Sequence, residues 1–175
     1  MPGPGRGLGA VVLLAVLVAV LLFGGEGSED GVAPNAATYE LGGRVSGEVL
    51  RVVDGDTIEV DVDGRTEDVR LIGVDTPETV KPGEPVQCFG PQASEFTKRV
   101  LEGETVRLEF DRELRDVYDR LLAYVHVGEL FVNAELIDGG FARTLEIEPN
   151  TSRAAELARL QQAAGAAGRG LWGAC

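Results

Sequence analysis

Residues 57–64 read TIEVDVDG, a strict alternation of apolar and polar side chains that decides the fold class of the chain. The isoleucine and the two valines share one face, which is the pattern of a β-strand with one buried side. The Asp-Gly pair at 63–64 is a strong short-range hairpin signal, so residues 67–74 are expected to return as the antiparallel partner. The sequence therefore predicts a half-buried antiparallel meander.

Further strands and helices can be predicted outward from this hairpin. Side-chain periodicity predicts strands over 47–53, 105–110 and 121–127, and helices over 91–103, 132–137 and 153–164. Five short strands with interleaved helices indicate a closed or partly closed β-barrel of the oligonucleotide-binding (OB) type.

The composition sets limits on the class of protein. The chain has 175 residues, enough for one ordinary domain with or without an appendage. It carries 29 acidic and 16 basic residues, for a formal net charge of −13. A field of this sign repels polyanions, which argues against indiscriminate adsorption to DNA or to anionic membranes. It leaves open a nucleic-acid enzyme whose local site is basic or holds a metal.

An apolar run of 14 residues, Ala10–Phe23, lies near the N-terminus behind Arg6. At about 1.5 Å per residue it would cover roughly 21 Å as a helix, less than the ~30 Å hydrocarbon core of a membrane. This pattern favours a secretory signal peptide, and an uncleaved membrane anchor is the alternative. We therefore expect a signal peptide or anchor over 1–27, a flexible linker over 28–38 and one folded domain over 39–175.

The chain contains one histidine, His126, and two cysteines, Cys88 and Cys175. Zinc sites with four Cys or His ligands are therefore excluded, and a Ser-His-Asp or Cys-His catalytic site could use only His126. His126 lies on the face of its strand opposite the apolar side chains, so it is expected to face solvent. Export would place the cysteines in an oxidising compartment, which favours a Cys88–Cys175 disulfide over two free thiols.

An acidic turn, Asp54-Gly55-Asp56, immediately precedes the alternating strand. Asp56 has the parity of Ile58, so its carboxylate should point to the core side of the sheet, at the rim. A carboxylate in that position needs a partner, because burying it alone is costly.

A second acidic turn, residues 75–78 with the sequence DTPE, follows the return strand. In that strand Arg70 has the parity of Ile72 and Val74, so its guanidinium should also point toward the barrel side. Brought together across the sheet, Asp56 and Asp75 would form a hard, all-oxygen site suited to Ca²⁺.

Each acidic turn taken alone favours ordinary turn and cap chemistry over a metal site. A third element, DVYDR at residues 116–120, delivers a second arginine, Arg120, just before the strand at 121–127. Two acidic turns together with two arginines favour a functional site over unrelated turns.

In combination these motifs resemble the staphylococcal nuclease (thermonuclease) family. The resemblance runs from about residue 45 to Trp172 and depends on VDGDT at 53–57, RLIGVDTPE at 70–78 and DVYDR at 116–120. It implies an α+β, mainly β fold, a five-stranded OB-type barrel with three helices. It also implies Ca²⁺-dependent hydrolysis of phosphodiester bonds in DNA and RNA, with cleavage of the 5′-oxygen–phosphorus bond that leaves 3′-phosphates. We expect a monomer for which nucleic acid is the substrate.

The resemblance also implies the metal ligands. By position, Asp56 and Asp75 would supply carboxylates to Ca²⁺, and Thr76 would supply its backbone carbonyl. Asp54 would lie close by and act through a water molecule.

The catalytic residues are carried over in the same way. Glu78 matches the residue usually assigned as the general base, and Arg70 and Arg120 match the two residues that bind the phosphate. Tyr118 matches an aromatic residue near the nucleotide. Two planar guanidiniums suit this chemistry because the charge that develops on the phosphorus oxygens must be neutralised.

Some residues depart from the family pattern, and the sequence leaves two other functions open. Val117 replaces a lysine and Asp119 replaces a glycine, while residues 144–150 (TLEIEPN) lack the tyrosines of the family archetype. One alternative is a catalytically silent OB-fold module that binds oligonucleotides. The other is an exported structural module stabilised by Ca²⁺. Retention of all five site residues, Asp56, Arg70, Asp75, Glu78 and Arg120, argues against a silent module.

Overall fold

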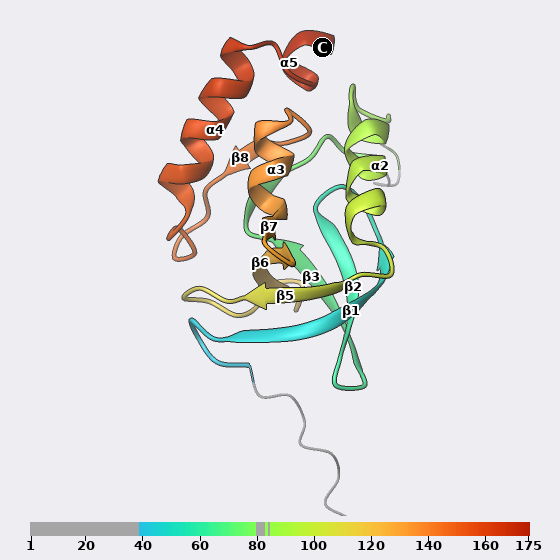
Figure 1. Cartoon of the computed structure of the whole chain (residues 1–175), viewed down its shortest axis with the longest axis vertical. Coiled ribbons are helices and arrows are strands. Elements are labelled where there is room, and N and C mark those ends of the chain that lie inside the picture. The colour runs from blue at the N-terminus through green and yellow to red at the C-terminus, as the bar shows by residue number, and fades with distance from the viewer. Residues whose placement is uncertain (1–38, 80–82, 84) are drawn as a thin grey trace, which may run out of the picture. The chain divides into compact units, whose positions relative to one another are not determined.

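The alternating segments form a closed five-stranded β-barrel in the computed structural model, which describes residues 39–79, 83 and 85–175 (Figure 1). The barrel strands are β1 (Arg44–Val52), β2 (Thr57–Val62), β3 (Arg65–Leu71), β5 (Thr105–Glu109) and β6 (Leu121–Val127). They are hydrogen-bonded antiparallel in the order β3-β2-β1-β5-β6, and a parallel pairing of β3 with β6 closes the barrel. The expected mainly β, OB-type fold is confirmed.

The helices gather at one end of this barrel (Figure 1). They are α2 (Gly90–Leu101), α3 (Val132–Asp138), α4 (Ala154–Ala166) and the single turn α5 (Leu171–Ala174). The first three lie close to the predicted limits. The short strand β7 (Leu130–Phe131) pairs with β6, and β4 (Gly73–Asp75) pairs with β8 (Arg143–Leu145) outside the barrel.

The barrel core is filled by the apolar face of the alternating strands. Ile58, Val60 and Val62 are fully buried, whereas Glu59 and Asp61 on the opposite face of β2 are partly exposed. Burying each such aliphatic side chain contributes about 1.5–3 kcal/mol. The neighbouring strands add Val69, Leu71, Val106, Leu108, Leu121, Ala123 and Val125.

The return strand differs from its prediction, which had it continue to residue 74. It ends at Leu71, and the chain turns at Gly73, whose φ of +76° is strained for any residue with a side chain. A Cβ on Gly73 would also lie 2.5 Å from Cδ1 of Leu157 in α4. The face assigned to Arg70 from parity was therefore wrong. Val69 and Leu71 hold the core side of β3, and Arg70 lies on the other face.

His126 does not face solvent as expected. It is 8% exposed, and its ring stacks on Phe131 with the centroids 4.8 Å apart. The reason is that β7 pairs with β6 and makes Phe131 the register partner of His126, so the Phe131 ring lies on the same face of the sheet and covers the imidazole. Burial, together with the charge of Arg107, lowers the pKa of His126.

The structure joins Cys88 and Cys175 by a disulfide bond that links the start of α2 to the C-terminal residue. The apolar run 10–23 and the segments 1–27 and 28–38 lie outside the described residues. Within the described part of the chain, none of the helices combines the length and the apolar character needed to cross a membrane.

Candidate active site

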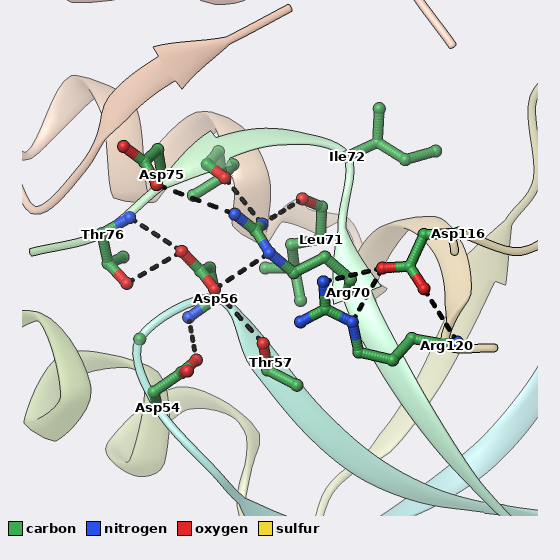
Figure 2. Close-up of polar contacts among 12 residues, drawn as sticks. Asp54, Asp56, Thr57, Arg70, Leu71, Ile72, Asp75, Thr76, Asp116 and Arg120 are labelled. Atoms are coloured by element: carbon green, nitrogen blue, oxygen red, sulfur yellow. Dashed lines mark hydrogen bonds and ion pairs between the residues drawn. The ribbon is translucent and has the colours of Figure 1, made fainter. Parts of the chain in front are cut away.

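The acidic turn before β2 is joined directly to the acidic turn after β4 (Figure 2). Asp56 is 7% exposed, and its Oδ2 accepts hydrogen bonds from the backbone N of Thr76 at 2.8 Å and from Oγ1 of Thr76 at 3.0 Å. Its own backbone N donates to Oδ1 of Asp54 at 3.1 Å. The buried carboxylate of Asp56 therefore finds its hydrogen-bond partner in the second turn. These hydrogen bonds hold the two acidic turns together.

Helix α2 is hydrogen-bonded to the first acidic turn. Oγ1 of Thr97, a buried residue of that helix, donates a hydrogen bond of 2.7 Å to the carbonyl oxygen of Gly55. Gly55 itself lies so close to the second turn that an added Cβ would be 2.6 Å from Cγ2 of Thr76. Glycine is therefore required here by the close approach of the two turns.

Arg70 lies between the two acidic turns (Figure 2). Its Nε is 3.2 Å from Oδ1 of Asp56, and its Nη2 is 3.9 Å from Oδ1 of Asp75. Nη1 donates to the carbonyl oxygens of Leu71 at 2.8 Å and Val74 at 2.7 Å. These carbonyls become available because the chain turns after β3, so the turn, and not sheet parity, directs the guanidinium toward the acids.

Arg120 is held by an acid of its own motif. Its Nε and Nη2 lie 2.8 Å and 2.7 Å from Oδ2 of Asp116, and its backbone N donates to Oδ1 of the same residue. Burial raises the pKa of Asp116, but the hydrogen bonds from Arg120 outweigh this and hold it below its usual value. The guanidinium carbon of Arg120 is 5.4 Å from the centroid of the Tyr118 ring, within cation–π range.

Glu78 is half-buried, and both its carboxylate and its backbone make hydrogen bonds. Its carboxylate Oε1 accepts a hydrogen bond of 2.7 Å from the backbone N of Thr79. Its backbone N donates to Oε1 of Gln87 at 3.1 Å, and its carbonyl oxygen accepts from the backbone N of Gln87 at 2.9 Å.

A pocket of about 150 Å³ brings these groups together. Seven of the eight site residues expected from the sequence line it; its lining comprises Asp54, Asp56, Arg70, Asp75, Thr76, Pro77, Glu78 and Arg120. Tyr118, which is 77% exposed, instead lines an adjoining pocket of about 290 Å³ that shares both arginines.

The larger pocket is mostly aliphatic and was missed by the sequence analysis. Val117, Leu145 and Ile147 line it, and Tyr118 is its one aromatic residue in the described part of the chain. The absence of tyrosines from residues 144–150 was evident in the sequence. The signal that was overlooked is the alternation of Leu145 and Ile147 with glutamates, which predicts that the two apolar side chains share one face.

The carboxylates of the smaller pocket crowd one another. Burial, and then the charge of Asp56, raises the pKa of Asp54 to about 6. The same two causes, in the same order, raise the pKa of Asp75 even though Arg70 and Arg143 oppose them. A raised pKa means that the charged form of a carboxyl group is disfavoured, and a nearby cation would stabilise that charged form.

The donor set fits a hard cation. Asp54, Asp56 and Asp75 line the pocket with carboxylate side chains, and Thr76 lines it as well. Oxygen donors of this kind are what Ca²⁺ prefers. No three His, Cys, Asp or Glu side chains within 39–79, 83 and 85–175 come close enough together to form a metal cluster.

Comparison with known proteins covers most of the chain. Residues 68–174 match the family described as staphylococcal nuclease homologue. The chain is 49% identical over 140 residues to the thermonuclease of Staphylococcus intermedius, which covers 80% of this chain and 82% of that relative. It is 47% identical over 124 residues to the thermonuclease of Staphylococcus hyicus, with coverage of 71% and 73%. The endonuclease YncB of Bacillus subtilis (strain 168) is 46% identical over 103 residues, with coverage of 58% and 49%.

Proposed function

Because the chain belongs to the staphylococcal nuclease family and is a nuclease, we propose that the pocket between its acidic turns hydrolyses phosphodiester bonds of DNA and RNA with Ca²⁺ as cofactor. One observation carries this assignment. Segments far apart in the sequence place three aspartates, Glu78 and two arginines around a single small pocket.

Arg70 and Arg120 bind the phosphate in this proposal. Attack on a phosphodiester adds charge to the phosphorus oxygens, and a planar guanidinium neutralises that charge through paired hydrogen bonds. Both arginines are already oriented by acids, Arg70 by Asp56 and Arg120 by Asp116, so little side-chain entropy is lost when substrate binds.

Glu78 is proposed to act as the general base. It takes a proton from the attacking water while the water oxygen forms a bond to phosphorus and the bond from phosphorus to the 5′-oxygen breaks. The 5′-oxygen takes a proton from solvent water and leaves as a hydroxyl, and the phosphate remains on the 3′ side. The half-buried carboxylate lines the same pocket as both arginines, as this role requires.

Asp56 and Asp75 would hold the metal, together with the Thr76 carbonyl and, through water, Asp54. When bound, Ca²⁺ supplies positive charge that polarises a phosphate oxygen and offsets the crowded carboxylates. With few protein ligands, a dissociation constant on the order of 10⁻⁴–10⁻³ M is expected, as in extracellular calcium modules.

A nucleotide base is proposed to occupy the larger pocket beside Tyr118. The base would stack on the one aromatic side chain there and contact aliphatic walls on the other sides. One-sided stacking predicts weaker base recognition than a pocket lined by several aromatic rings.

Export is proposed from the apolar run 10–23, which acts either as a cleaved signal peptide or as a membrane anchor. Weak calcium binding is consistent with a protein that works outside the cell, where Ca²⁺ is abundant. The chain is proposed to act as a monomer.

The test is degradation of DNA and RNA with Ca²⁺, with EDTA, and by a Glu78→Gln variant. EDTA should abolish the activity, and Glu78→Gln should lower kcat by at least about 10²-fold. Glu129→Gln is the matched control, because this glutamate is exposed in the turn before β7 and does not line the pocket. A silent OB-fold module would bind oligonucleotides without hydrolysing them, and that result would overturn the assignment.

A further inference from the structure

Gln87 binds the backbone of Glu78 on both sides of its Cα, at the N–H and at the carbonyl oxygen. Its side-chain Oε1 accepts a hydrogen bond from the backbone N of Glu78, and its backbone N donates to the carbonyl oxygen of Glu78. The two residues are nine positions apart in the chain, so these hydrogen bonds hold positions 78 and 87 next to each other. The carboxylate of Glu78 bonds to the next residue, Thr79, which makes the side-chain position depend on the backbone position.

The segment that carries Gln87 is packed tightly against the second acidic turn. A Cβ on Gly90, the first residue of α2, would lie 2.7 Å from Cγ2 of Thr79 and 2.9 Å from the carbonyl oxygen of Pro77. The same helix hydrogen-bonds the first acidic turn through Thr97. One rigid element therefore fixes both acidic turns, and residues 87–90 connect it to Glu78.

The disulfide anchors this connection at Cys88, the residue next to Gln87. Its partner Cys175 follows α5, where the buried Leu171 donates a backbone hydrogen bond of 2.8 Å to the carbonyl oxygen of Gly140. The bridge thus ties the exposed segment just before α2 to a C-terminal turn that is itself fixed to the body of the domain.

We propose that Gln87 is a positioning residue for Glu78 and that the Cys88–Cys175 bridge keeps Gln87 in place. The proposal rests on the proposed role of Glu78 as the base. A base on a loop is useful only if its carboxylate stays within hydrogen-bond reach of the attacking water, and a displacement near 1 Å costs up to about 10²-fold in rate. Loss of Gln87 should therefore lower kcat and leave KM unchanged, because Glu78 takes no part in binding the phosphate.

The experiment compares two substitutions of Gln87 in the full chain. Gln87→Met keeps the length of the side chain but removes the acceptor, and Gln87→Glu keeps an acceptor oxygen in the same position. We expect kcat for DNA hydrolysis to fall about tenfold in Gln87→Met with KM within twofold of wild type, and to recover most of that loss in Gln87→Glu. Gln92→Met is the matched control, because Gln92 is an exposed glutamine on α2, the helix that follows Gln87, and this variant should keep wild-type kcat.

The role of the bridge is tested by a Cys88→Ser/Cys175→Ser pair, alone and combined with Gln87→Met. The serine pair should lower kcat several-fold alone and add little to Gln87→Met, because both changes release the same segment. All rates are measured well below the lowest unfolding midpoint, so that every variant is fully folded. A merely structural role predicts lower midpoints with unchanged kcat.

Three results would overturn the inference: wild-type kcat in Gln87→Met, equal impairment of Gln87→Glu and Gln87→Met, or the full effect of the serine pair in the Gln87→Met background. Glu78→Gln is measured in parallel. If it remains active, the proposed function fails and the inference fails with it. If it is inactive while Gln87→Met is unimpaired, the inference alone fails.

Discussion

Replacing Gly55 with alanine measures how closely the two acidic turns must approach each other. An ideal Cβ at Gly55 would lie 2.6 Å from both Cγ2 and Oγ1 of Thr76, whereas ordinary van der Waals contact begins at 3.4 Å. The turns must therefore separate by about 0.8 Å to accept one methyl group, since packed interiors leave no spare volume.

The separation acts directly on the proposed metal ligands. Thr76 donates two hydrogen bonds to Asp56, of 2.8 Å and 3.0 Å, and both lengthen as Thr76 retreats. The Thr76 carbonyl and Asp75 move with it, away from Asp56. A misplacement of this size is expected to lower kcat/KM by about 30- to 100-fold and to weaken Ca²⁺ binding about tenfold. Overpacking should also cost about 1–3 kcal/mol of stability.

The assay is the initial rate of DNA hydrolysis over a Ca²⁺ titration, with calorimetric measurement of Ca²⁺ affinity. Gly165→Ala in α4 is the control, because the nearest neighbouring atom to its Cβ would be Cδ2 of Trp172 at 3.9 Å. A folded Gly55→Ala variant with wild-type kcat/KM and wild-type Ca²⁺ affinity would refute the reasoning.

Three further predictions follow from the contacts of individual residues. Asp116→Ala should lower kcat/KM about tenfold, seen in steady-state kinetics, because Arg120 loses the carboxylate that orients it. Burial and the charge of Arg107 lower the pKa of His126 in the folded protein. Between that folded pKa and about 6.5, the unfolded chain therefore binds a proton at His126 that the folded chain does not. The contribution of neutral His126 to folding stability is complete above about pH 6.5 and is lost as the pH falls through the folded pKa. His126→Phe should therefore make urea unfolding less dependent on pH in that window, and an unchanged pH dependence would contradict the burial of His126. The Cys88→Ser/Cys175→Ser pair should lower the free energy of unfolding by about 4–5 kcal/mol, because the bridge closes a loop across 87 positions; a loss below about 1 kcal/mol in denaturant titrations would contradict this.

Much of the barrel could be predicted because its determinants are local. The alternation of Ile58, Val60 and Val62 fixes which face of β2 is buried, and the Asp-Gly turn at 63–64 fixes its partner. The parity of Asp56 with these residues correctly placed its carboxylate at the rim, where Thr76 and Arg70 bond it.

The errors arose where distant segments decide the outcome. The face of the sheet on which Arg70 lies was predicted from the parity of one continuous strand. In the structure β3 ends at Leu71, and the chain turns so that residues 73–75 pair with β8 instead. His126 looked exposed because its pairing with Phe131 of β7 is not evident from the residues around His126. The hydrogen bonds between Gln87 and Glu78 join residues nine positions apart, and no periodicity in the sequence predicts them.

The most direct measurement is a crystal structure of the protein with Ca²⁺ and a short DNA strand bound to the inactive Glu78→Gln variant. The account predicts one calcium ion within about 2.3–2.6 Å of oxygens from both Asp56 and Asp75, and one phosphate contacted by both Arg70 and Arg120. A cation bound away from these two aspartates, or a phosphate that leaves either guanidinium facing solvent, would contradict it.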